Sequence, residues 1–201
     1  MTARTKSGRY HHGNLRTALI DAAVELIEKS GVRNFSVAEA SRRLGVTVSA
    51  PYAHFAGRDD LLAAVAVRAL ELFRTELEPE LERVTKPADR LAAIARCYVR
   101  FAAAHRPLFE LLFVAGLDKT RHPEIAVAEK PIDDAFLSAV HALRDGDALA
   151  TAVEATAHGY AVLLLDGAFG TSRDAAELAA EGAARATLAL VKGRRLLSRP
   201  G

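Results

Sequence analysis

Apolar residues recur at intervals of three and four along most of the chain, and this spacing limits the fold more than any other feature. In the first such segment Leu15, Leu19, Ala22, Leu26 and Ile27 share one face, with acidic residues opposite. An α-helix has about 3.6 residues per turn, so this spacing gathers the apolar side chains into one stripe. No segment shows the apolar–polar alternation of a half-buried strand. The sequence therefore predicts an all-α fold of about nine helices.

Proline and acidic residues divide the later part of this pattern into helices. Asp59 and Asp60 suit the first turn of a long amphipathic helix, which Pro79 is expected to kink or end. Further helices are predicted at about residues 88–104, 108–117, 125–143, 148–169 and 174–192. Gly159, Gly167 and Gly182 are expected to let the last two helices approach closely.

Charge is distributed unevenly along the chain. Residues 1–58 hold nine Lys and Arg against four Asp and Glu, whereas residues 59–201 hold eighteen against twenty-one, within a net charge of +2. A positive end on a slightly negative body is typical of a protein that meets a polyanion through that end. On charge alone, ordinary variation of the surface explains the asymmetry equally well.

Two features bear on the cellular setting. Cys97 is the single cysteine, so no intramolecular disulfide can form, and a reducing, cytoplasmic location is the simplest interpretation. No run of about eighteen uninterrupted apolar residues is present, so no segment is expected to span a membrane.

Residues 36–45 predict a short helix followed by a tight turn. Ser36, with Glu39 three residues later, is a capping-box pattern that favours a helix over Val37–Leu44. Gly45 then supplies the left-handed backbone conformation that a tight turn needs.

A second helix is expected to begin at about Thr47 or Val48 and to contain Pro51. With either Thr47 or Ser49 as N-cap, the proline falls in the first helical turn, where its missing N–H does little harm. Its ring would then meet a thymine methyl group or simply stiffen the start of the helix.

Two helices joined in this way form a helix-turn-helix, whose second helix can enter the major groove of DNA. Small and hydroxyl-bearing side chains there allow contact with base edges, and Arg, Tyr and His can donate hydrogen bonds to the flanking phosphates. Similar helical hairpins are common in proteins that bind no nucleic acid, so the pattern alone leaves both readings open.

The segment NLRTALIDAAVELIEKSGVRNFSVAEASRRLGVTVSAPYAHFAGRDDLLAAVA resembles the DNA-binding domain of the TetR family of bacterial transcriptional regulators. "LGV", "YAHF" and "RDDLL" occur in the family's order and spacing. "YHHG" near the N-terminus and Ala-Pro before the tyrosine resemble one subgroup. The resemblance implies major-groove contacts near residues 47–50, phosphate contacts at the tyrosine, histidine and following arginine, and a core position for Phe35 and Phe55. The predicted DNA contacts are Ser36, Arg42, Arg43, Thr47, Val48, Ser49, Ala50, Pro51, Tyr52, His54 and Arg58.

The resemblance also implies a helix-turn-helix domain over residues 10–57 and a regulatory and dimerisation domain over residues 58–201. "RPLFELLF" and "TAHGYAVLLLDGAF" resemble the C-terminal domain of the same subgroup, although the chain has no Trp before its His-Gly pair. Family members form homodimers through their last two long helices, here about 148–169 and 174–192. The run "AVLLLDGAF" is apolar nearly all round, which favours burial against both its own core and a partner.

In this family a small ligand binds within the regulatory domain and moves the helix that leads to the DNA-binding domain. The expected effector is apolar or amphipathic, and its binding would release double-stranded operator DNA. His158 is expected to form a hydrogen bond between helices beside Gly159. The candidate lining residues, each of which also suits plain core, are Phe101, His105, Phe109, Leu112, Phe113, Leu117, His141 and Tyr160.

Other functions have little support in the sequence. His11 and His12 are adjacent and Cys97 has no partner at metal-binding spacing, so neither a metal site nor a catalytic cysteine is predicted. No glycine-rich phosphate loop follows a strand, and no enzymatic activity or cofactor is expected. A helical protein–protein adaptor that does not bind DNA is the alternative, but it explains neither the basic N-terminal region nor the polar cluster near Tyr52. The effector, the operator and the choice between repression and activation are left open.

Overall fold

The computed structural model describes residues 15–113, 116–144 and 146–197 of the 201-residue chain. Within them it has eight α-helices, three short 3₁₀ helices and no strand, so the all-α prediction is confirmed. The YHHG motif of the predicted subgroup lies outside the described residues. The elements are α1 (Leu15–Ser30), η1 (Val32–Asn34), α2 (Val37–Leu44), η2 (Ala50–Ala53), α3 (Arg58–Glu82), α4 (Pro87–Ala104), α5 (Arg106–Phe113), α6 (Pro123–Ala142), α7 (Asp147–Leu165), α8 (Ala175–Gly193) and η3 (Arg194–Leu196).

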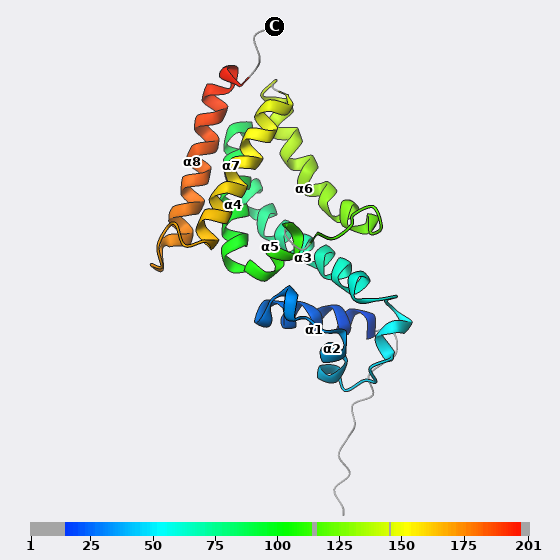
Figure 1. The fold of residues 1–201 in the computed structure, drawn as a ribbon. Helices are drawn as coiled ribbons and strands as arrows, with labels where there is room; N and C mark the ends of the chain where they lie inside the picture. The colour runs from blue at the N-terminus through cyan, green and yellow to red at the C-terminus, as the bar shows by residue number, and fades with distance from the viewer. Residues whose placement is uncertain (1–14, 114–115, 145, 198–201) are drawn as a thin grey trace, which may run out of the picture.

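The helices form a small N-terminal lobe and a larger C-terminal lobe, and α3 runs from one into the other (Figure 1). The start of α3 packs on α1, whereas its later turns pack on α4 and α6. Leu61 and Val65 are fully buried near its start, and Phe73 and Leu77 are buried further along. With 25 residues, α3 is about 37 Å long. One helix therefore contributes to the cores of both lobes.

Proline marks the start of several helices. Pro87 and Pro123 are the first residues of α4 and α6, and Pro107 is the second residue of α5. These positions suit proline because the first N–H groups of a helix have no intrahelical partner. Of the two outcomes expected at Pro79, a kink or a helix end, the second does not occur: α3 continues through the proline to Glu82, so Pro79 lies in the last turn.

The helix α2 begins and ends where the sequence predicts. Ser36 is its N-cap in an extended conformation, and its carbonyl accepts the N–H of Glu39 at 3.1 Å. The side-chain part of the capping box is absent, because Ser36 makes no side-chain cap bond and Glu39 instead pairs with Arg42. Gly45 follows with φ 67° and ψ 25°, the left-handed conformation expected of it.

The last two helices run antiparallel beside α4 (Figure 1). Arg96 and Arg100 of α4 pair with Glu181 and Glu177 of α8, with N–O distances of 2.5 Å and 2.6 Å. Hydrogen bonds from the two guanidinium groups hold the pKa of both glutamates below its usual value. These pairs, together with buried alanines, fix α8 on α4.

The helix α7 is apolar on two faces. Leu149 and Val153 face the core of the lobe, whereas Val162 and Leu163 are exposed. By length and composition alone α7 is apolar enough to cross a membrane, with a mean hydropathy of 1.4, although it has no run of eighteen uninterrupted apolar residues. Its packing against α4, α6 and α8 makes it a helix of the C-terminal lobe with an uncovered apolar face.

Candidate nucleic-acid interface and internal cavity

The N-terminal lobe contains the predicted helix-turn-helix, with a shorter second element. Residues 47–49 form a turn, and the 3₁₀ helix η2 of four residues takes the place of the helix predicted from Thr47 or Val48. Both α2 and η2 pack on α1. Phe35 and Phe55 are buried beneath them, as predicted.

Pro51 explains why the second element is short and rigid. Ser49 is the N-cap of η2 and Pro51 its second residue. The N–H groups of Tyr52 and His54 bond to the carbonyls of Ser49 and Pro51 at 3.2 Å and 2.9 Å, a 3₁₀ pattern. The ring of Pro51 is buried, so its predicted contact with DNA is corrected: it packs inside the lobe and stiffens the element.

Nine of the predicted DNA contacts are exposed in the N-terminal lobe, whereas Ala50 is half-buried and Pro51 buried. Val48 and Tyr52 expose 54% and 57% of their surface, a large exposure for an apolar and an aromatic side chain. The hydroxyl oxygens of Thr47 and Ser49 lie 3.2 Å apart. The exposed contacts are Ser36, Arg42, Arg43, Thr47, Val48, Ser49, Tyr52, His54 and Arg58.

The three arginines of this set differ in their partners. Arg42 and Arg43 form exposed ion pairs with Glu39 and Glu25. Such pairs contribute little to stability in water, so both guanidinium groups can exchange a carboxylate for a phosphate.

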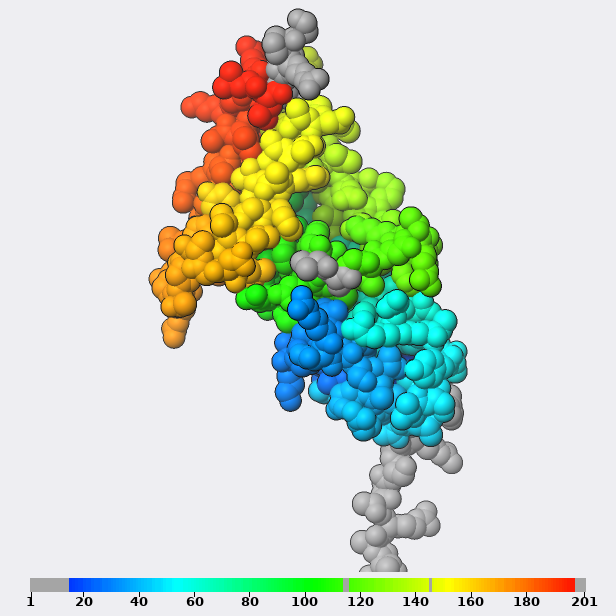
Figure 2. Space-filling view, viewed as in Figure 1, coloured from blue at the N-terminus to red at the C-terminus, as the bar shows by residue number. Residues whose placement is uncertain are grey.

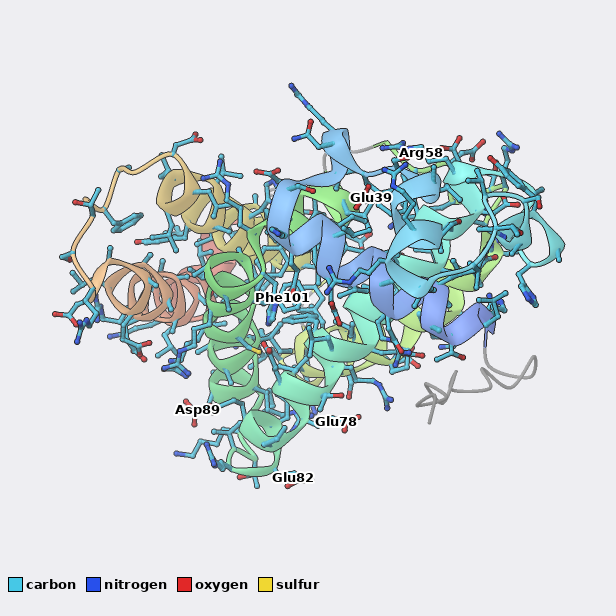
Figure 3. All side chains as sticks on the ribbon, turned by 90° about the horizontal axis from the view of Figure 1, so that it is seen from below. Glu39, Arg58, Glu78, Glu82, Asp89 and Phe101 are labelled. Atoms are coloured by element: carbon cyan, nitrogen blue, oxygen red, sulfur yellow. The ribbon has the colours of Figure 1, made fainter. Side chains whose placement is uncertain are left out.

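Arg58 instead acts within the lobe. Its Nη2 donates to the carbonyl of Val32 at 2.7 Å, its Nε donates to that of Phe35 at 3.4 Å, and its guanidinium lies 5.9 Å from the ring centre of Phe35. Figure 3 shows Arg58 at the N-terminal lobe, on the same side as Glu39. Arg58 thus braces the first turn of α3 against the segment that precedes α2.

The C-terminal lobe contains a cavity of about 500 Å³ bounded by α3, α4, α5, α6 and α7. Figure 2 shows the surface hollowed between α6 (yellow-green) and α7 (yellow), and Figure 3 shows Phe101 of α4 in the middle of the lobe. Most of the wall is apolar or aromatic. The lining residues are Leu70, Phe73, Ile94, Ala95, Tyr98, Phe101, Leu112, Phe113, Glu129, Ile132, Asp133, Phe136, Thr151, Val153, Glu154, Ala155, Ala157 and His158.

Three of the eight predicted lining residues, Phe101, Leu112 and Phe113, do line this cavity. Phe109 is a buried neighbour of the wall, with its ring 5.5 Å from that of Tyr98. Leu117 lines a different, more polar groove between the lobes.

The remaining predicted residues lie elsewhere and are corrected here. His141 is exposed on α6. Tyr160 stacks on Phe169 of the α7–α8 turn, with ring centres 5.8 Å apart. His105 lies at the end of α4 between Glu28 and Glu76. The sequence can place these residues on or next to apolar helices, but only the packing of the helices decides which of them reach the cavity.

Tyr98 and His158 form the polar part of the wall that the aromatic residues surround. The Tyr98 hydroxyl and His158 Nδ1 share a hydrogen bond of 3.0 Å between α4 and α7, as predicted for His158. The His158 ring also stacks on Phe109 at 5.8 Å. Burial, with Glu154 nearby, raises the pKa of Tyr98, so the phenol stays protonated.

Three carboxylates line the cavity on α6 and α7, and the sequence pattern gave no sign of them. Glu129 pairs with Lys119 at 2.5 Å. Asp133 and Glu154 have no hydrogen bond or ion pair within the described residues. Both side chains are exposed, but partial burial raises their pKa values, and so does repulsion from Glu129 on Asp133 and from Asp133 on Glu154. Lys119 and Lys130 oppose the shift of Asp133.

The described residues offer little to catalysis or metal binding. Burial raises the pKa of the Cys97 thiol to about 12, so it is not a nucleophile at neutral pH. In residues 15–113, 116–144 and 146–197 no three His, Cys, Asp or Glu side chains are placed to hold a metal ion.

Comparisons with known proteins agree with this division into two lobes. Residues 19–65 match the family model of bacterial regulatory proteins, tetR family, and residues 91–186 match the tetracyclin repressor-like C-terminal domain. The uncharacterized HTH-type transcriptional regulator YobS of Bacillus subtilis (strain 168) is 28% identical over 176 residues, 82% of this chain and 86% of YobS.

Among solved structures, a protein of unknown function from Rhodococcus sp. RHA1 is 29% identical, with a TM-score of 0.70 over 90% of this chain and 97% of that one. RolR in complex with resorcinol is 24% identical, with a TM-score of 0.62 over 92% and 93% of the two chains. At that identity the likeness to RolR shows the fold alone.

Proposed function

The chain belongs to the TetR family of transcriptional regulators, and from this premise we propose that it is a dimeric repressor released from operator DNA by a small amphipathic ligand. Membership of the family makes it a DNA-binding regulator rather than an enzyme, and its site of action is the cytoplasm. The observation that carries the proposal is α3. This helix supports the exposed helix-turn-helix at one end and, through Leu70 and Phe73, lines the cavity further along.

Contacts with base edges are assigned to the turn before η2. Thr47 and Ser49 offer hydroxyl groups and Val48 an apolar surface that suits a thymine methyl group. Tyr52, His54, Arg42, Arg43 and Ser36 are assigned to phosphates, because they are exposed and can donate hydrogen bonds. Ala50 lies behind the turn, and Arg58 holds α3 in place.

A second copy is the proposed partner of α7 and α8. Val162, Leu163, Leu178 and Leu188 are exposed on these helices. Exposed apolar patches of this kind mark protein interfaces, and a two-fold dimer would present two helix-turn-helix units to an inverted-repeat operator. The proposed domains keep their limits at residues 10–57 and 58–201, with α3 serving both cores.

Ligand binding is proposed to act through α3. A ligand between α3, α6 and α7 would change the position of α3 in the C-terminal lobe, and Arg58 would transmit the shift to Val32 and Phe35. A coupling free energy of about 1–3 kcal/mol between ligand and operator is typical of such systems. RolR, which has the same fold, was crystallised with the small ligand resorcinol, and this is in keeping with a small-molecule effector.

A mobility-shift assay on the DNA upstream of the gene tests the proposal. We expect a sequence-selective shift whose affinity falls steeply with salt, because phosphate contacts release counterions. Tyr52→Phe should weaken binding to all sequences alike, whereas Val48→Ala or Ser49→Ala should change the preference between sequences. Ser172→Ala, in the α7–α8 turn, is the matched control.

Two results would count against this assignment. No selective shift at any salt concentration would favour the helical adaptor that does not bind DNA. Unchanged base preference in the Val48 and Ser49 variants would place the base-reading surface elsewhere. A promoter–reporter assay with and without the protein then separates repression from activation.

A further inference from the structure

The cavity of the C-terminal lobe has an aromatic interior and acidic groups on one side. Phe73, Phe101, Phe113 and Phe136 contribute rings from four different helices. Its volume of about 500 Å³ lies in the range of about 300–1,000 Å³ that is usual for small-molecule sites. The body of a fitting ligand is therefore apolar, with room for at least one ring or short alkyl chain.

The acidic side consists of Asp133 on α6 and Glu154 on α7, with Glu129 one turn before Asp133. Lys119 neutralises Glu129, and Lys130 is held by Asp134 at 2.8 Å. Asp133 and Glu154 lie on the solvent-exposed side of the cavity and have no hydrogen bond or ion pair within the described residues. Partial burial and neighbouring carboxylates raise the pKa of both. One side of the cavity thus holds two carboxylates without an ion-pair partner among the described residues, beside apolar walls. The charges of Lys119 and Lys130 act on Asp133 without pairing with it.

Ligand charge follows from this arrangement. An anion would add repulsion to two carboxylates that already repel each other, and a neutral ligand without hydrogen-bond donors would desolvate them without compensation. A cation would relieve the repulsion and could also lie against the aromatic faces, which attract positive charge. Tyr98 and His158, two further polar side chains of the wall, hydrogen-bond to each other.

We propose that the effector is an organic cation with an apolar body, such as an aryl-alkyl ammonium, whose charge lies between Asp133 and Glu154. The aromatic residues enclose its apolar part. That this ligand acts as an effector rests on the proposed function, whereas its chemical class follows from the cavity alone.

Calorimetric titration with three matched probes tests the ligand class. They are a series of phenylalkyl-trimethylammonium ions, the neutral compounds in which a tert-butyl group replaces the ammonium group, and phenylalkanoates of the same lengths. We expect the best cation to bind at least about tenfold more tightly than its neutral counterpart, and the carboxylates not to bind measurably.

Variants test the placement of the charge. Asp133→Asn combined with Glu154→Gln should reduce the preference for the cation to less than about threefold, because both attracting charges are gone. Asp134→Asn is the matched control: it removes a neighbouring carboxylate of α6 that faces Lys130 and does not line the cavity. Thermal unfolding of each variant shows that it is folded before its affinities are compared.

Three results would overturn the inference: equal or tighter binding of the neutral or carboxylate series, a preference that survives in the double variant, or no binding by any cation of the series. The mobility shift without ligand separates this outcome from the proposed function. Operator binding without cation preference overturns the ligand class alone. Cation preference without operator binding overturns the regulator and leaves the ligand class standing.

Discussion

At the scale of single residues, Gly182 shows how one missing side chain sets the approach of two helices. A Cβ at this position in α8 would lie 2.6 Å from Cε1 of Tyr160 in α7, and Tyr160 is itself stacked on Phe169. An aromatic ring confined in this way cannot move aside freely. The close packing of α7 on α8 therefore depends on a glycine that helix propensity alone would disfavour.

Gly182→Ala should lower the free energy of unfolding by about 1 kcal/mol, since overpacking of about 1–3 kcal/mol outweighs a helix-propensity gain of about 1 kcal/mol. In a Tyr160→Ala background the same change should raise it by about 0.5–1 kcal/mol, because only the propensity gain is left. Urea unfolding of the four proteins measures both values. The same effect in both backgrounds would show that the ring is not what excludes the methyl group.

The three glycines of this region also show a limit of sequence reasoning. All three are predicted to permit close helix approach, yet only Gly182 meets a neighbouring helix. A Cβ on Gly159 would have nothing within 4 Å, and Gly167 follows α7 with φ 83°, where its role is conformational. A glycine is visible in the sequence, but the reason for it depends on which side chain lies opposite.

At the scale of elements, the two ion pairs between α4 and α8 make the docking of α8 sensitive to acid. Both glutamates have lowered pKa values in the folded protein, because guanidinium groups bond to their ionised form. Such groups stabilise the fold above the pKa they have in the unfolded chain, and the contribution disappears as the pH falls through the folded pKa.

Glu177→Gln combined with Glu181→Gln should therefore lower the melting temperature at pH 7 but have little effect at pH 3. The measurement is thermal unfolding of both proteins across that range. Glu82→Gln is the control, because Glu82 lies at the outer end of α3 (Figure 3) and forms no ion pair with any of the described residues. A difference between variant and parent that stayed constant down to pH 3 would contradict the electrostatic origin.

His105 connects elements of both lobes. It follows α4, and its ring nitrogens lie 2.8 Å from Oε1 of Glu28 in α1 and 3.2 Å from Oε1 of Glu76 in α3. A side chain that joins the two lobes in this way can pass a shift of α3 and α4 on to α1.

If the proposed function holds, His105→Ala should reduce the effect of ligand on operator affinity by at least about fivefold, equivalent to about 1 kcal/mol of coupling. The ratio of operator affinities with and without ligand gives this value. His141→Ala, an exposed histidine of α6, should leave the ratio unchanged. If operator affinity is weaker but the ratio with and without ligand is unchanged, His105 only stabilises the fold.

Elements differ in how well the sequence predicts them. Long periodic helices such as α1, α4 and α8 are found to within a few residues, since many side chains report the same face. A segment of four residues, such as η2, is too short to show a periodic pattern of apolar residues. Its 3₁₀ conformation depends instead on the local backbone geometry at Pro51. The cavity is harder still, because Asp133 and Glu154 lie on separate helices and only their packing brings the two carboxylates together.

At the scale of the whole molecule, the uncovered apolar surface on α7 and α8 bears on assembly. Leu163 and Leu178 expose 51% and 56% of their surface. In the proposed two-fold dimer both side chains would be buried in the interface, and so would their copies in the second subunit.

Leu163→Glu combined with Leu178→Glu should convert the dimer to a folded monomer, because burying like charges against their symmetry mates is unfavourable. Analytical ultracentrifugation measures the mass, and the mobility shift should weaken by at least about a hundredfold as the two halves of the operator are no longer bound together. Val127→Glu, exposed at 72% on α6, is the control. A double variant that remained dimeric would place the interface elsewhere.

The short length of η2 limits how many base pairs one subunit can recognise. With Pro51 turned into the lobe and Ala50 half-buried, only Thr47, Val48 and Ser49 are assigned to base edges, so one subunit can distinguish only a few base pairs. A chromosome offers about 10⁶ or more competing sites, and a recognition sequence of a few base pairs cannot distinguish one site among so many. In the proposed dimer, selectivity comes from binding two half-sites at a fixed spacing. A ligand that changes the distance between the two helix-turn-helix units would then lower operator affinity without altering any residue that contacts a base.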